Sequence, residues 1–63
     1  MRKIKILVVE DSFVFRELLI KSLKTEPMFE VVAYATNPYE ARDAIIKYNP
    51  DVMTLDVELP RMS

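Results

Sequence analysis

Residues 4–12 of the chain, IKILVVEDS, join an apolar run to three polar residues. Apart from Lys5, the run at 4–9 is apolar and rich in β-branched residues, which is typical of a buried strand in a parallel sheet. Glu10, Asp11 and Ser12 end this strand, and a side-chain oxygen of Asp11 or Ser12 can cap a helix that follows. The stretch therefore predicts a strand whose carboxyl end presents two carboxylates.

Two helices and two further strands are predicted along the rest of the chain. Apolar residues at spacings of three and four predict a helix over 13–24 that ends before Pro27. Residues 29–35 predict a second strand, and 52–55 a third. Residues 38–48 predict a second helix, which Thr36 or Asn37 can cap. The alternation of strand and helix predicts an α/β fold with a parallel sheet and crossover helices.

The first predicted helix carries two phenylalanines and an arginine near its start. The helical spacing predicts that Phe13 and Phe15 pack into the core or along the flank of the helix. Arginine is mostly exposed in folded proteins, so we expect Arg16 to lie on the solvated face.

Length and composition limit the fold and the partners. The 63 residues make at most one small domain, residues 1–63, and without cysteine there is no disulfide or thiolate–metal framework. The net charge of −1 argues against a nucleic-acid-binding face. No window approaches the roughly 20 apolar residues of a membrane span, so we expect a cytoplasmic protein with no membrane partner.

The chain contains no glycine, although tight turns with positive φ favour that residue. Two explanations are open at this point. Either the turns are unusual, or the sequence stops before the glycine-containing loops of a larger domain.

Three acidic residues, Glu10, Asp11 and Asp56, follow the carboxyl ends of predicted parallel strands. If the strand 4–9 lies between the other two, Asp11 and Asp56 converge at strand ends about 4.8 Å apart. Close carboxylates repel one another, so they take up protons, pair with cations or bind metal. Oxygen ligands suit Mg²⁺, and a carboxylate beside it can attack a phosphoryl group. Acidic residues also end strands simply because they face water, and the pattern alone leaves both interpretations open.

Three stretches of the sequence together resemble a known family. ILVVEDS at 6–12, FEVVAYATNPYEA at 29–41 and PDVMTLDVELPRM at 50–62 are similar to the first half of a response-regulator receiver domain. The resemblance is closest to the receiver of chemotaxis-type protein-glutamate methylesterases, and it covers essentially the whole chain. It implies a flavodoxin-like fold, here a truncated half-domain with three parallel strands in the order 2-1-3.

The resemblance also implies a role for each acidic residue. Asp56 matches the aspartate that accepts phosphate from the phosphohistidine of a histidine kinase, the expected partner. Glu10 and Asp11 match the acidic pair that holds the cofactor Mg²⁺ together with Asp56, and Glu58 matches the position whose backbone carbonyl completes the metal site. Glu10 stands where the family commonly has Asp, which puts its direct contact with the metal in doubt.

Receiver domains continue with two more strands and three helices, which carry a Thr or Ser and a Lys that contact the phosphoryl group. We therefore expect the chain itself to lack esterase activity and stable phosphorylation, while its parent is a protein-glutamate methylesterase. The third strand would form an open, apolar edge. This edge predicts a homo-oligomer, most simply a two-fold dimer with antiparallel third strands.

Other functions remain open from the sequence. The chain could be a purely structural α/β half-domain without a ligand, or the receiver of a response regulator with a different output, such as DNA binding. A phosphatase of the haloacid-dehalogenase type also uses an aspartate at a strand end. Such an enzyme needs a second acid two residues later, which Glu58 matches imperfectly, and it leaves the pair Glu10 and Asp11 unexplained.

Overall fold

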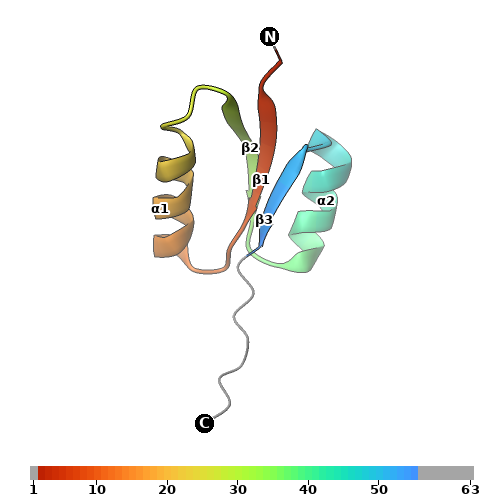
Figure 1. Cartoon of the computed structure of the whole chain (residues 1–63). Helices are drawn as coiled ribbons and strands as arrows, with labels where there is room; N and C mark the ends of the chain where they lie inside the picture. Colours follow the sequence, from red (N-terminus) through yellow and green to blue (C-terminus); the bar gives the residue numbers. More distant parts are fainter. Residues whose placement is uncertain (1, 56–63) are drawn as a thin grey trace.

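The protein forms a three-stranded sheet between two helices in a computed structural model that describes residues 2–55 (Figure 1). The elements in chain order are β1 (Ile4–Val9), α1 (Phe13–Leu23), β2 (Phe29–Ala35), α2 (Pro38–Tyr48) and β3 (Val52–Leu55). All strand pairs are parallel, and the order is β2-β1-β3. The predicted α/β fold and its 2-1-3 order are confirmed, and α1 ends one residue earlier than expected.

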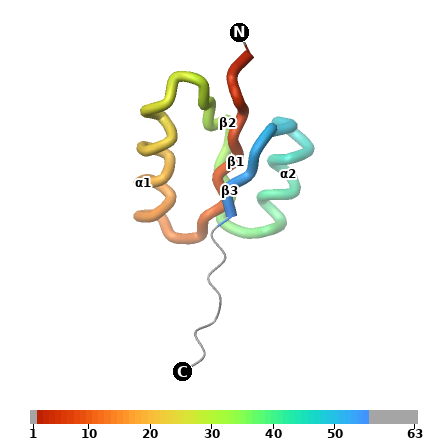
Figure 2. The backbone as a smooth tube through the Cα atoms, in the orientation of Figure 1, coloured from red at the N-terminus to blue at the C-terminus, as the bar shows by residue number. Residues whose placement is uncertain are grey.

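The two crossover connections place the helices on opposite faces of the sheet, so the central strand β1 is covered on both (Figure 2). Leu7 and Val8, whose side chains alternate across β1, are both fully buried. Parallel sheets need such cover on both faces, which is why the β1 sequence is almost continuously apolar. The core on the α2 side joins residues from three elements: Leu7, Val9, Ala35, Ala41 and Ala44.

Side-chain oxygens and one left-handed residue fix the helix ends. Ser12, not Asp11, caps α1, and its hydroxyl accepts a hydrogen bond from the amide of Phe15. Asn37 caps α2 through the amide of Glu40 at 2.9 Å. Asn49 ends α2 with a φ of 47°, the conformation that glycine often supplies after a helix. Asparagine tolerates this region better than most residues, so this turn forms without glycine.

Of the two positions expected for Phe13 and Phe15, packing into the core is wrong, whereas Phe13 does lie along the flank of the helix, beside Arg16. The side chains of Phe13 and Phe15 are 65% and 60% exposed. Helix α1 faces the sheet instead with a neighbouring row of side chains, in which Leu19, Ile20 and Leu23 are half-buried. The apolar period predicts which part of α1 is apolar, but α1 has two neighbouring rows of apolar side chains. Only the row with Leu19, Ile20 and Leu23 packs against β1 and β2.

Arg16 is also placed differently from the prediction, because it is buried rather than solvated. Its guanidinium carbon lies 4.4 Å from the centroid of the Tyr34 ring on β2 and 5.4 Å from that of Phe13. The Arg16 Nε atom is buried without a hydrogen-bond partner within residues 2–55. Aromatic faces attract the guanidinium and let its apolar stem pack, which explains how the charge enters this position.

Strand β3 is short and lies at one edge of the sheet. Val52 and Leu55 are 47% and 59% exposed. Between β3 and α2 runs an apolar groove of about 380 Å³, whose lining includes Ile45, Met53 and Leu55. None of the helices within the described range has the length and apolar character to cross a membrane.

Candidate functional site

The candidate site lies at the carboxyl end of the sheet, where β1 passes into the acidic pair. Val9 is the register partner of Ala35 in β2 and of Leu55 in β3, so the three strands end together. The amide of Glu10 donates to the carbonyl of Ala35 at 2.9 Å and extends the ladder by one more bond. The backbone that carries the acidic pair is therefore fixed by the sheet itself.

The two acidic side chains have different environments. The Glu10 side chain is buried, with 3% exposure, and its partners include the amide of Ser12, which donates to Oε1 at 3.0 Å. Asp11 is exposed. A strand end that merely faces water explains Asp11 but not Glu10, because a buried carboxylate is costly unless polar groups or cations compensate it.

The remaining predicted site residues, Asp56 and Glu58, lie outside the described residues. Leu55 is the last described residue and precedes Asp56 in the sequence. Within residues 2–55, no three His, Cys, Asp or Glu side chains come together as a metal site. Glu10 and Asp11 are the described residues whose carboxylate oxygens suit Mg²⁺, and the predicted four-residue metal site is neither confirmed nor contradicted.

A polar contact that the sequence analysis did not anticipate lies at the start of α2. The hydroxyl and the amide of Thr36 both donate to Glu40 Oε1, at 2.5 and 2.8 Å. These bonds, first the one from the hydroxyl and then the one from the amide, lower the pKa of Glu40, and the charge of Arg16 adds to the effect. The pattern Asn37-x-x-Glu40 resembles a capping box and could have predicted this contact.

Arg16 is the other residue that sequence reasoning misplaced. Arg16 lies in the row of α1 that faces the sheet, because Leu19, Ile20 and Leu23 follow it by three, four and seven residues. This spacing could have predicted a buried Arg16, but the prediction followed the usual exposure of arginine side chains instead.

Comparison with known proteins identifies the family of the chain. Residues 6–63 match the family of the response regulator receiver domain. Over 63 residues, all of this chain, the sequence is 59% identical to a protein-glutamate methylesterase/protein-glutamine glutaminase 2 of Syntrophomonas wolfei, of which 18% is covered. Over 61 residues, 97% of this chain, it is 54% identical to a protein-glutamate methylesterase/protein-glutamine glutaminase of Syntrophotalea carbinolica, of which 17% is covered.

The chain thus spans less than a fifth of the length of these relatives. The match to the receiver family covers nearly the whole chain, and the parallel sheet in the order β2-β1-β3 with an acidic pair after β1 agrees with it. The chain belongs to the response regulator receiver domain family.

Proposed function

We propose that this receiver accepts a phosphoryl group on Asp56 from the phosphohistidine of a histidine kinase. The observation that carries the proposal is the pairing of Val9 with Leu55, because Glu10 and Asp11 follow the first and Asp56 follows the second in sequence. Parallel strands present their carboxyl ends at the same edge of a sheet, which is where α/β proteins bind ligands.

The described part of the site fits Mg²⁺. Its donors are carboxylate oxygens, Asp11 is exposed to an incoming ion, and the Glu10 side chain is held by the Ser12 amide. Asp11, Asp56 and the backbone carbonyl of Glu58 would bind the ion, with Glu10 acting directly or through water. When bound, Mg²⁺ neutralises the charge on the oxygens of the transferring phosphoryl group.

The reaction is a nucleophilic substitution at phosphorus. A carboxylate oxygen of Asp56 attacks, the P–N bond of the phosphohistidine breaks, and its electron pair returns to the imidazole nitrogen of the kinase. The product is an aspartyl phosphate, a mixed anhydride that water can hydrolyse. Because water hydrolyses this anhydride, we expect the adduct on this chain to be short-lived.

Trapping distinguishes a transient acceptor from an inert one. The chain is incubated with Mg²⁺ and acetyl phosphate, reduced with borohydride, and analysed by peptide mass spectrometry. We expect reduction at residue 56, dependence on Mg²⁺, and loss in Asp56→Asn, while Asp43→Asn on the exposed face of α2 behaves as wild type. Absence of trapping at residue 56 would sink the assignment, and an adduct that persists without trapping would contradict its short lifetime.

The larger protein is proposed to be a cytoplasmic chemotaxis response regulator whose output is a protein-glutamate methylesterase. The support is the printed name of the relatives that share 54–59% of these residues. Residues 6–63 match the receiver family, so on this proposal the esterase lies outside them, and these residues alone should not release methyl groups from a methylated receptor peptide. The alternative is a response regulator with a DNA-binding output. It would require a sequence-specific DNA-binding domain in the same gene product.

Self-association through β3 is the second part of the proposal. The edge of β3 is unpaired within residues 2–55, and Val52, Met53 and Leu55 are exposed along it. A two-fold axis would pair two such edges antiparallel. Light scattering after size exclusion should show a dimer at micromolar concentration that Leu55→Lys abolishes and Val14→Lys, on the exposed face of α1, leaves intact. A wild-type monomer would refute this part without affecting phosphorylation.

A further inference from the structure

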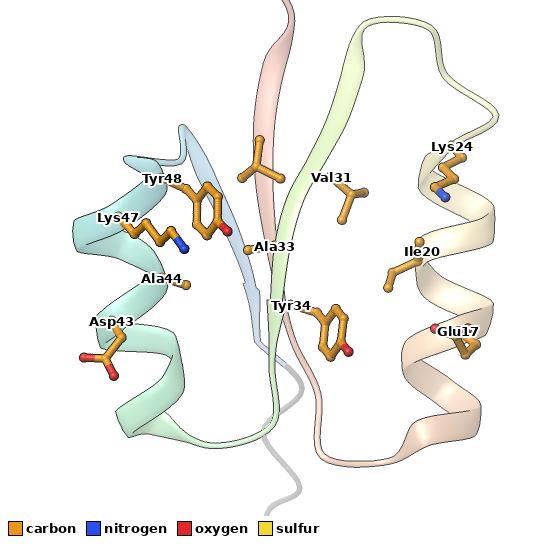
Figure 3. A pocket seen from close by; sticks show the side chains of 11 residues that line it. Glu17, Ile20, Lys24, Val31, Ala33, Tyr34, Asp43, Ala44, Lys47 and Tyr48 are labelled. Atoms are coloured by element: carbon orange, nitrogen blue, oxygen red, sulfur yellow. The ribbon is translucent and has the colours of Figure 1, made fainter.

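A groove of about 640 Å³ runs along the outer edge of β2, on the side of the sheet opposite to β3 (Figure 3). Its floor is the edge of β2 at residues 31–34, and its walls come from α1 and α2. Val31 and Tyr34 point toward α1, whereas Ala33 points toward α2 (Figure 3). The groove is therefore a strand edge set between two helices.

The edge has backbone groups available for a further strand. β2 pairs only with β1 among the described strands, so every second peptide group on its outer side has no ladder partner there. The register changes between Ile6 and Leu7, which leaves Val32 as an extra residue in β2. The four residues 31–34 offer roughly 13 Å of edge at about 3.3 Å per residue.

Four charged side chains give the groove a direction. Lys24, which directly follows α1, and Lys47 on α2 stand on the two walls toward the amino end of β2 (Figure 3). Glu17 and Asp43 stand on the same walls toward the carboxyl end (Figure 3). All four residues are exposed. Each end of the groove thus carries two like charges, one from each helix, and the two ends are opposite in sign.

We propose that this groove binds an extended peptide as an added strand antiparallel to β2. Antiparallel pairing is the more stable arrangement per residue. In that direction the peptide has a basic residue first, beside Glu17 and Asp43, and an acidic residue last, beside Lys24 and Lys47. Four residues of high β propensity lie between them, with alternate side chains against Ile20 and Ala44 in the walls.

A second copy of this chain fits the groove less well. Two β2 edges can approach to the 4.8 Å of a sheet only if the helices on both faces do not meet first. In each copy, α1 and α2 line the groove on both sides of the edge. A single extended chain has no walls of its own and avoids this obstacle.

Two peptides of the same composition test the proposal on the full chain. The first is fluorescein-labelled acetyl-Lys-Val-Thr-Val-Thr-Glu-amide, and the second exchanges its terminal Lys and Glu. Fluorescence anisotropy should show about tenfold tighter binding of the first, since four exposed charge contacts change from attraction to repulsion. Amide resonances of residues 31–34 should shift on binding. N-methylation of alternate peptide amides should abolish binding if the ladder forms.

A charge-exchanged protein provides the matched control. The variant with Lys24→Glu, Lys47→Glu, Glu17→Lys and Asp43→Lys changes exposed residues only and should prefer the second peptide by a similar factor. Equal binding of the two peptides by wild type, or shifts confined to residues outside 31–34, would overturn the proposal. So would a dimer of the wild-type chain that the peptide competes away, because the groove would then be an interface between copies.

Discussion

Val9 and Leu55 are register partners at the carboxyl ends of the neighbouring parallel strands β1 and β3. From Val9 the sequence continues into Glu10 and Asp11, and from Leu55 into Asp56. The sheet thereby places the acidic pair beside Leu55, the residue that precedes Asp56 in the sequence. This relationship connects the fold to the proposed chemistry, since carboxylates at one edge repel one another unless a cation joins them.

Replacing Asp11 should weaken binding of Mg²⁺. We expect Asp11→Asn to lower the affinity by roughly tenfold or more, because the affinity of a hard cation depends on the number of charged oxygen ligands. Calorimetry or the Mg²⁺-dependent shift of the Ser12 amide measures it. Asp56→Asn should have a similar effect, and Asp43→Asn should have none. Wild-type affinity in both site variants would favour the interpretation of a structural domain without a ligand.

Leu7 should be the most sensitive core position. Its side chain is fully buried between β1 and α2. Leu7→Ala should lower the free energy of unfolding by about 2–5 kcal/mol, which is enough to unfold a domain of this size in water. Ile46 is 74% exposed, so Ile46→Ala should change the free energy of unfolding by less than about 0.5 kcal/mol. Urea denaturation followed by circular dichroism gives both values, and equal losses would contradict the position of the core.

The strand and helix bounds could be predicted because local chemistry decides them. Apolar, β-branched runs gave the bounds of β1, β2 and β3, and the prolines at 27, 38 and 50 mark where helices stop or start. The order of the strands in the sheet, 2-1-3, was implied by the resemblance to receiver domains. The position of the acidic pair at the end of β1 followed from the same pattern.

The burial of Arg16 and Glu10 could not be predicted in the same way. The spacing within α1 indicates the row that contains Arg16, but the aromatic ring beside its guanidinium, that of Tyr34, lies on another element. The environment of Glu10 depends on how the turn after β1 directs the Ser12 amide. The environment of such side chains depends on residues of other elements or on the path of a turn. Helix caps and strand ends depend on residues that are adjacent in the sequence.

The left-handed conformation of Asn49 can be tested by two substitutions. Asn49→Ala should lower the free energy of unfolding by about 1 kcal/mol, because a Cβ is unfavourable at a φ of 47°. Asn49→Gly should leave it unchanged or raise it, since glycine is favoured after the end of a helix. Both variants keep the bond from the residue 49 amide to the carbonyl of Ile45. Chemical denaturation measures the difference, and equal values for Ala and Gly would argue against this turn.

Arg16 should be replaceable by an apolar residue of similar length. Arg16→Met loses the cation–π contacts with Tyr34 and Phe13, about 2 kcal/mol for a desolvated guanidinium, but removes a buried Nε–H whose desolvation costs about 1–3 kcal/mol. We expect the free energy of unfolding of Arg16→Met to be at most about 1 kcal/mol below that of wild type, and it can be higher. Arg16→Ala also removes the packed stem and should be less stable than Arg16→Met. Arg42→Met, at an exposed position of α2, is the control. A large loss in Arg16→Met would show that the guanidinium has a compensating partner.

Acid should weaken the start of α2 through Glu40. The Thr36 hydroxyl and amide, with the charge of Arg16, hold the pKa of Glu40 below its usual 4.5, and slight desolvation of this exposed carboxylate opposes them. A carboxylate with a lowered pKa stabilises the folded state above its unfolded-state pKa, and this contribution disappears as the pH falls through the lower, folded-state value.

The melting temperature of Glu40→Gln should therefore lie below that of wild type at pH 7, and the difference should shrink as the pH falls from about 4.5 to 3. Added salt should reduce the effect of Glu40→Gln at neutral pH, because the charge is exposed and screening is effective there. A difference for Glu40→Gln that stays constant between pH 7 and pH 3 would show that the Thr36 contact does not depend on the ionised carboxylate.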